Sequence, residues 1–145
     1  MKPTTLQLRF LLFTLLALAS TPLTADPTHI PGKFVWADLV THDAASAQQF
    51  YHAWMGWEFR PAGDVQLITL QDRTIGTVRQ RAQTQDNPGR PRWIGYVSVS
   101  AVDAASKRVI ASGGQVLLPQ QNDALHGDFA LVADGENALF GLIRR

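Results

Sequence analysis

The chain has 145 residues, 46% of them hydrophobic, which is enough for one compact domain with its own core. Its 13 basic and 12 acidic side chains give a net charge of +1. This near-neutrality argues against nucleic acid or an anionic membrane surface as a partner. The chain contains no cysteine, which excludes disulfides, a lipid-attachment cysteine and thiol catalysis.

The first 25 residues are typical of a secretory signal peptide. Lys2 and Arg9 precede the apolar run 10–19, and small residues provide cleavage sites near residue 19 or residue 25. The run is shorter than the roughly 20 residues of a membrane span, so an uncleaved anchor is the less favoured alternative. We expect a periplasmic or secreted protein with no stable membrane insertion after cleavage. Without Lys2 and Arg9, 11 basic residues face 12 acidic ones, a net charge of −1.

Residues 34–81 form the first predicted module after an extended lead-in. The aromatic run 34–40 predicts a strand, and Thr41 to Asp43 offer capping side chains for the helix that follows. The apolar face of that helix contains Ala47, Phe50, Tyr51 and Trp54, and Gly56 ends it. Three further strands are predicted at 57–60, 65–70 and 74–81.

Residues 93–145 repeat the same order. A strand at 93–100 and a helix at 103–112 are followed by strands at 115–118, 129–133 and 138–143. The tetrapeptide Asp-Ala-Ala-Ser occurs at 43–46 and again at 103–106, which indicates an internal repeat. Each half is too small to bury its own sheet face, so 82–92 is expected to be a linker within one domain, 26–145.

This duplication predicts an α+β fold of paired βαβββ modules. The two modules are expected to form a curved mixed sheet with a concave cleft on one side and the helices on its outer face.

An ordered set of residues in both halves resembles a known family. The set consists of Trp36-Ala37-Asp38-Leu39 before Thr41 and Asp43, Phe50-Tyr51 before Gly56-Trp57, Trp93 and Tyr96 before Val102-Asp103, and Gly127 and Asp134 before Phe140-Gly141. It is similar to the glyoxalase/bleomycin-resistance family of the vicinal oxygen chelate superfamily over essentially the whole mature chain. The resemblance implies a U-shaped cleft, often with a divalent metal at its floor. Members include glyoxalases, extradiol dioxygenases, epimerases, thiol transferases and metal-free drug-binding proteins.

The metal-ligand positions that the resemblance implies are poorly filled in this chain. Three of them correspond to Trp36, Ile94 and Gly141, which cannot bind a metal. On the strand 74–81, Gln80 is the only weak ligand. We therefore expect neither a bound metal nor another cofactor.

Strand alternation places Trp36 and Asp38 on one face of the first strand, and Tyr96 and Ser98 on the corresponding face of the second module. The register of the resembling family makes this face the concave one. Asp38 is the candidate catalytic group, as a base or as an anchor for a cationic ligand. The alternative is a structural ion pair between Asp38 and an arginine such as Arg79. The predicted ligand-binding residues are Trp36, Asp38, Arg79, Tyr96, Ser98 and His126, with His126 at the cleft mouth.

The favoured function is an exported glyoxalase-like protein that binds a small, partly apolar molecule in a metal-free cleft. A first alternative is a metal-dependent lyase or dioxygenase of the superfamily, with ligands from a partner subunit or from Gln80, His126 and Asp38. A second is a non-catalytic interaction protein whose cleft is filled by side chains. A Ser-His-Asp hydrolase is disfavoured because no G-x-S-x-G turn is present. The residues do not decide whether a reaction is catalysed, or whether the chain forms a homodimer.

Overall fold

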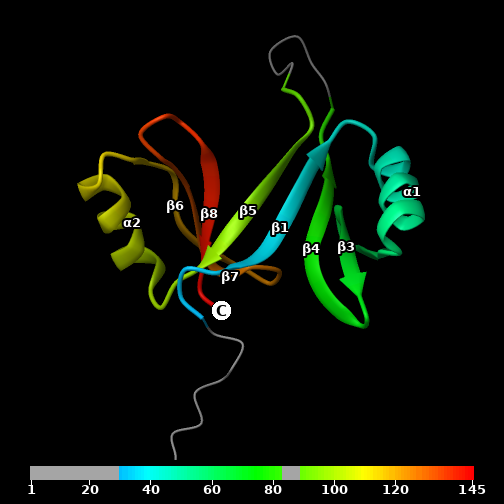
Figure 1. Cartoon of the computed structure of the whole chain (residues 1–145), viewed down its shortest axis with the longest axis horizontal. Coiled ribbons are helices and arrows are strands. Elements are labelled where there is room, and N and C mark those ends of the chain that lie inside the picture. Colours follow the sequence, from blue (N-terminus) through cyan, green and yellow to red (C-terminus); the bar gives the residue numbers. More distant parts are fainter. Residues whose placement is uncertain (1–29, 83–88) are drawn as a thin grey trace, which may run out of the picture.

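Two strand–helix–strand–strand–strand modules follow each other along the chain (Figure 1). The computed structural model describes residues 30–82 and 89–145, so the predicted signal peptide and part of the predicted linker lie outside the described residues. The first module contains β1 (Phe34–Thr41), α1 (Ala44–Met55), β2 (Glu58–Ala62), β3 (Val65–Leu70) and β4 (Arg73–Gln80). The second contains β5 (Arg92–Ser98), α2 (Val102–Ala111), β6 (Gln115–Asp123), β7 (Gly127–Ala133) and β8 (Leu139–Ile143). Within these ranges, no helix is long and apolar enough to cross a membrane.

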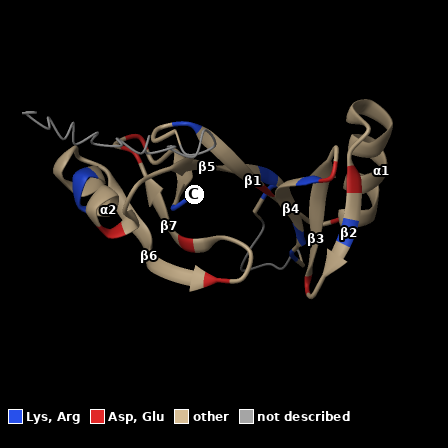
Figure 2. Ribbon diagram, turned by 90° about the horizontal axis from the view of Figure 1, so that it is seen from below, with Lys and Arg blue, Asp and Glu red and all other residues tan. Residues whose placement is uncertain are grey.

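All eight strands join in one mixed sheet with the order β2-β3-β4-β1-β5-β8-β7-β6. Each module contains one parallel pair, β1 with β4 and β5 with β8, and the antiparallel pair β1 and β5 joins the modules. The view from below shows α1 and α2 at opposite ends of the curved sheet, with acidic and basic residues interspersed on both modules (Figure 2). The predicted α+β fold class is confirmed.

The two helices cover separate apolar clusters. Leu39, Ile68 and Val78 pack under α1, while Val102 and Ala105 of α2 pack against Ala130, Val132 and Leu142 of the sheet. A third cluster of Trp36, Ile94, Tyr96 and Ile143 is separate from both. Because side chains alternate along β1, Leu39 packs in the α1 cluster while Trp36 belongs to the third one. Burial of each Leu, Ile or Val contributes roughly 1.5–3 kcal/mol, so both faces of the central strands stabilise the sheet.

The two copies of the repeated tetrapeptide occupy different helix positions. Asp43 is the N-cap of α1, and its Oδ1 accepts a hydrogen bond from the Ser46 amide at 2.9 Å. The N-cap of α2 is Ala101, and Asp103 lies inside the helix, where it binds Lys107. The copies are therefore two residues out of step, and Asp43 corresponds to Ala101 by its position in the helix.

β6 is longer than the predicted strand 115–118. It continues through Pro119 to Asp123, and the register against β7 shifts twice along the way. β6 is an edge strand and pairs with a neighbour on one side only. Pro119 has no N–H to donate, and at an edge strand this donor can be missing without a hydrogen bond being lost to a second neighbouring strand. Pro61 lies in the other edge strand, β2, for the same reason. The extension of β6 positions the turn that contains His126.

Candidate functional site

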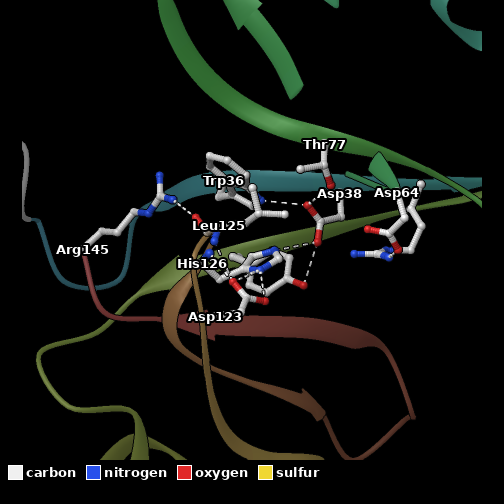
Figure 3. Close-up of polar contacts among 10 residues, drawn as sticks. Trp36, Asp38, Asp64, Thr77, Asp123, Leu125, His126 and Arg145 are labelled. Atoms are coloured by element: carbon white, nitrogen blue, oxygen red, sulfur yellow. Dashed lines mark hydrogen bonds and ion pairs between the residues drawn. The ribbon is translucent and has the colours of Figure 1, made fainter. Parts of the chain in front are cut away.

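The carboxylate of Asp38 is the centre of a buried polar network (Figure 3). Its Oδ1 accepts hydrogen bonds from Trp36 Nε1 and Thr77 Oγ1, both at 2.7 Å. Its Oδ2 accepts one from Tyr96 OH at 2.9 Å and lies 2.9 Å from His126 Nε2. The sheet register accounts for this convergence, because Thr77 is the β4 partner of Asp38 and Tyr96 the β5 partner of Trp36.

His126 lies between two carboxylates. Its Nε2 faces Asp38, and its Nδ1 lies 3.1 and 3.0 Å from the two oxygens of Asp123. Asp123 Oδ1 also accepts the His126 amide at 2.6 Å and the Leu125 amide at 2.8 Å, which fixes the turn. Only a protonated imidazole donates from both nitrogens. The arrangement therefore favours a charged His126 between two ionised carboxylates.

The pKa shifts agree with this charge assignment. Burial lowers the pKa of His126, but the bonds to Asp38 and Asp123 outweigh it, and the net pKa is raised. Burial raises the pKa of Asp38, but hydrogen bonds from His126, Thr77 and Trp36 outweigh it, and the net pKa is lowered. Burial and the neighbouring Asp38 raise the pKa of Tyr96, so its hydroxyl stays a donor. A general base works best with a pKa near the operating pH, which does not describe Asp38.

Aromatic rings enclose the imidazole. Tyr96 stacks on His126 with centroids 5.1 Å apart, and Phe129 lies 4.7 Å away. The guanidinium of Arg145 lies 4.2 Å from the centroid of Trp36, and its Nη2 donates to Leu125 O at 2.6 Å. Trp36 is only 5% exposed and Tyr96 only 3%. A ligand can therefore not stack on either ring without displacing the side chains above it.

The structure brings together four of the six predicted ligand-binding residues, namely Trp36, Asp38, Tyr96 and His126. Ser98 is fully buried, and its hydroxyl donates to the main-chain oxygen of Arg145 at 2.7 Å. Arg79 pairs with Asp64 near the surface, so the alternative of an Asp38–Arg79 pair is wrong and His126 takes that place.

Sequence reasoning missed Thr77, Asp123, Phe129 and Arg145 as members of this site. The Asp123 to His126 spacing is a signal for a side-chain-capped turn, but the predicted strand ended at residue 118. Thr77 required the β1–β4 register, and nothing in the local pattern pointed to Arg145.

The residues present do not fit the divalent metal that the fold suggests. Gly141 lies under the ring of Tyr96, and a Cβ added there would come within 2.0 Å of Tyr96 Cδ1. Trp36 and Ile94 belong to the buried apolar cluster. Gln80 accepts the Ala44 amide at 3.4 Å, on the α1 side of the sheet. In residues 30–82 and 89–145, no three His, Cys, Asp or Glu side chains converge in a way that could hold a metal ion.

Open volume lies beside this network. A cavity of about 540 Å³ is lined by Lys33, Phe34, Val35, Arg73, Thr74, Ile75 and Arg145. Since β1 and β4 are parallel neighbours, the first residues of both strands lie at the same end of the sheet. Arg145 belongs both to this cavity and to the cover of Trp36, so the cavity adjoins the buried network.

The sheet order and the two modules define the fold of the vicinal oxygen chelate superfamily. The chain belongs to the glyoxalase-like domain family, whose model matches residues 35–143. It is 27% identical over 113 residues to CFP32 of Mycobacterium tuberculosis, a protein named as a glyoxylase, with 74% of this chain and 43% of CFP32 covered. It is 28% identical over 131 residues to the anthracycline biosynthesis protein DnrV of Streptomyces peucetius, with 79% of this chain and 48% of DnrV covered. The chain thus spans less than half the length of these curated relatives.

Solved structures share the fold at low sequence identity. A methylmalonyl-CoA epimerase variant from Streptomyces coelicolor, in complex with 2-nitronate-propionyl-CoA, superposes with a TM-score of 0.55 and 14% identity. That match covers 79% of this chain and 98% of the epimerase. The hypothetical protein BH1468 from Bacillus halodurans superposes with a TM-score of 0.58 and 8% identity, over 79% of this chain and 94% of that one.

Proposed function

We propose that this chain is an exported glyoxalase-like protein that binds a small, partly apolar molecule without a metal ion. The observation that carries the proposal is a cavity of about 540 Å³ that adjoins the buried polar network of Asp38 and His126 through Arg145. That volume suits a small molecule. Its lining combines Phe34, Val35 and Ile75 with polar and charged side chains, as small-molecule sites do.

The packing of Tyr96 on Gly141 supports binding without a metal. A carboxylate ligand at position 141 would require the ring to leave, and the ring is held by its bond to Asp38. His126 supports the same conclusion, because both of its nitrogens already face carboxylates. Its imidazole has no lone pair available for a metal in this arrangement.

The structural neighbours agree with a small-molecule role for this fold, since epimerase structures of the same architecture contain methylmalonyl-CoA or 2-nitronate-propionyl-CoA. A homodimer stays a prediction, which light scattering on the purified protein tests.

Binding is tested by nuclear magnetic resonance with the isotope-labelled protein in excess EDTA. Small neutral aromatic amides such as benzamide, and short alkyl amides, should shift the amide signals of residues 33–35 and 73–75 in a saturable way. EDTA should leave the melting temperature unchanged. Retention of one equivalent of zinc, nickel, manganese or iron after dialysis, with three or more protein ligands, would overturn the metal-free site.

Export is tested separately. The charged start, the apolar run 10–19 and the small residues after it support a mature N-terminus near residue 20 or 26. N-terminal sequencing of protein from the periplasmic or extracellular fraction should find one of these starts. Intact Met1 in a membrane fraction would contradict the proposal.

A further inference from the structure

We propose that the molecule bound in this cavity is an organic anion, with a negatively charged head on an apolar body. This inference rests on the proposed function and names the class of ligand for the same site. Lys33, Arg73 and Arg145 all line the cavity, and no aspartate or glutamate side chain does. Within the described ranges, none of these three cations forms an ion pair.

Two other cavities among the described residues differ from this one in charge or in size. A cavity of about 430 Å³ beside α2 contains Arg108 but also Asp134, so its charges balance. A third, near Arg90 and Arg92, is basic but measures only about 10 Å³, which is too small for a ligand. Among these three, only the cavity at the start of β1 and β4 combines positive charge with room for a small organic molecule.

Arg145 is positioned to receive an anion. Its guanidinium lies on Trp36 and donates from Nη2 to Leu125 O. A guanidinium has five N–H donors, and the rest of those on Arg145 have no protein acceptor in the described part of the chain. Both contacts restrict the side chain before a ligand arrives, so less conformational entropy is lost on binding.

Phe34 provides the apolar wall. It is 65% exposed, although its ring rests on the backbone of β5: a Cβ added to Gly95 would come within 2.8 Å of Phe34 Cε1. One side of the ring is thus supported while much of the residue is open to solvent. An exposed but supported aromatic ring beside three cations suits a ligand that joins an apolar group to an anion.

The test compares benzoate with benzamide, which has nearly the same shape without the charge, by titration of the full chain. Benzoate should shift the amides of 33–35 and 73–75 and bind about tenfold more tightly than benzamide at low salt. Lys33→Gln and Arg73→Gln should each weaken benzoate about fivefold and leave benzamide unchanged. Lys107→Gln removes the same charge from α2 and should change neither. All three side chains are exposed, so these variants should fold.

Inorganic phosphate identifies the preferred head group. Displacement of benzoate by phosphate from the same amides supports an anion site open to phosphorylated ligands, and failure to displace it supports a carboxylate site. Equal binding of benzoate and benzamide, or no effect of Lys33→Gln and Arg73→Gln, would overturn the anion preference and leave the proposed function standing. If none of the probes, neutral or charged, shifts the cavity amides, both proposals fail.

Discussion

His126 is the positively charged centre of the buried polar network around Asp38. Its imidazolium is flanked by Asp38 and Asp123, and Tyr96 and Phe129 stack around it. Hydrogen bonds from Trp36, Thr77, Tyr96 and His126 occupy both oxygens of Asp38, so the network holds together without a ligand. It also explains why Asp38 has a lowered pKa despite its burial.

His126→Ala should therefore be strongly destabilising. The substitution leaves Asp38 ionised and buried without its charged partner, and breaking one side of a buried pair costs about 3–5 kcal/mol. Urea unfolding at pH 6 measures the loss. His52→Ala is the control, because His52 is exposed and its Nδ1 lies 2.9 Å from the Trp57 carbonyl oxygen without facing a carboxylate in the described residues. This variant should stay within about 0.5 kcal/mol of the original chain. Equal stability of the two variants would contradict the role of His126.

The close approach of Tyr96 to Gly141 gives a second prediction. Gly141→Ala forces a methyl group against the ring and should destabilise the protein by about 1–3 kcal/mol. In a Tyr96→Ala background the methyl group has room, so the same substitution should cost little. The four unfolding free energies form a double-mutant cycle. Additive effects of the two changes would mean that the ring does not occupy the space above Gly141.

At the scale of elements, the length of the edge strand β6 explains why the sequence predicted only part of the site. Strand alternation correctly grouped Trp36, Asp38 and Tyr96, because a period of two is a local property of each strand. Asp123 was missed because β6 continues past Pro119, which only its place at the sheet edge permits. The Arg145 contacts join residues remote in sequence, and such contacts leave no local pattern.

The two helix starts provide a matched test of the tetrapeptide repeat. Asp43→Ala removes the N-cap hydrogen bond to the Ser46 amide and should lower the urea midpoint of unfolding. Asp103→Ala changes the same letter of the repeat but removes only an exposed pair with Lys107, so the midpoint should hardly move. Similar losses in both variants would mean that the two aspartates occupy equivalent helix positions after all.

For the molecule as a whole, the duplicated element order was predictable, whereas the contents of the cleft were not. Turn residues and apolar periodicity mark each strand and helix that the structure describes, although β6 continues past the predicted strand 115–118. The composition of the buried network depends on which side chain fills a given space, as the ring of Tyr96 does above Gly141. It also depends on the charge state of His126. These properties depend on packing in three dimensions. The family resemblance therefore predicted a cleft but not which side chains fill its floor.

The pH dependence of global stability follows from the same network. Asp38 and Asp123 have pKa values below the ordinary 3.8, so their contribution is present above that value and is lost as the pH falls through the folded pKa. His126 has a pKa above the ordinary 6.5, so its contribution is complete below pH 6.5 and is lost as the pH rises through the folded pKa. Stability should therefore be highest between about pH 4 and pH 6.5. Urea unfolding from pH 3 to pH 9 should show both limbs, and in His126→Gln, which cannot be protonated, the alkaline limb should flatten. An alkaline limb of unchanged depth in that variant would assign the titration to another group and leave His126 neutral in the folded protein.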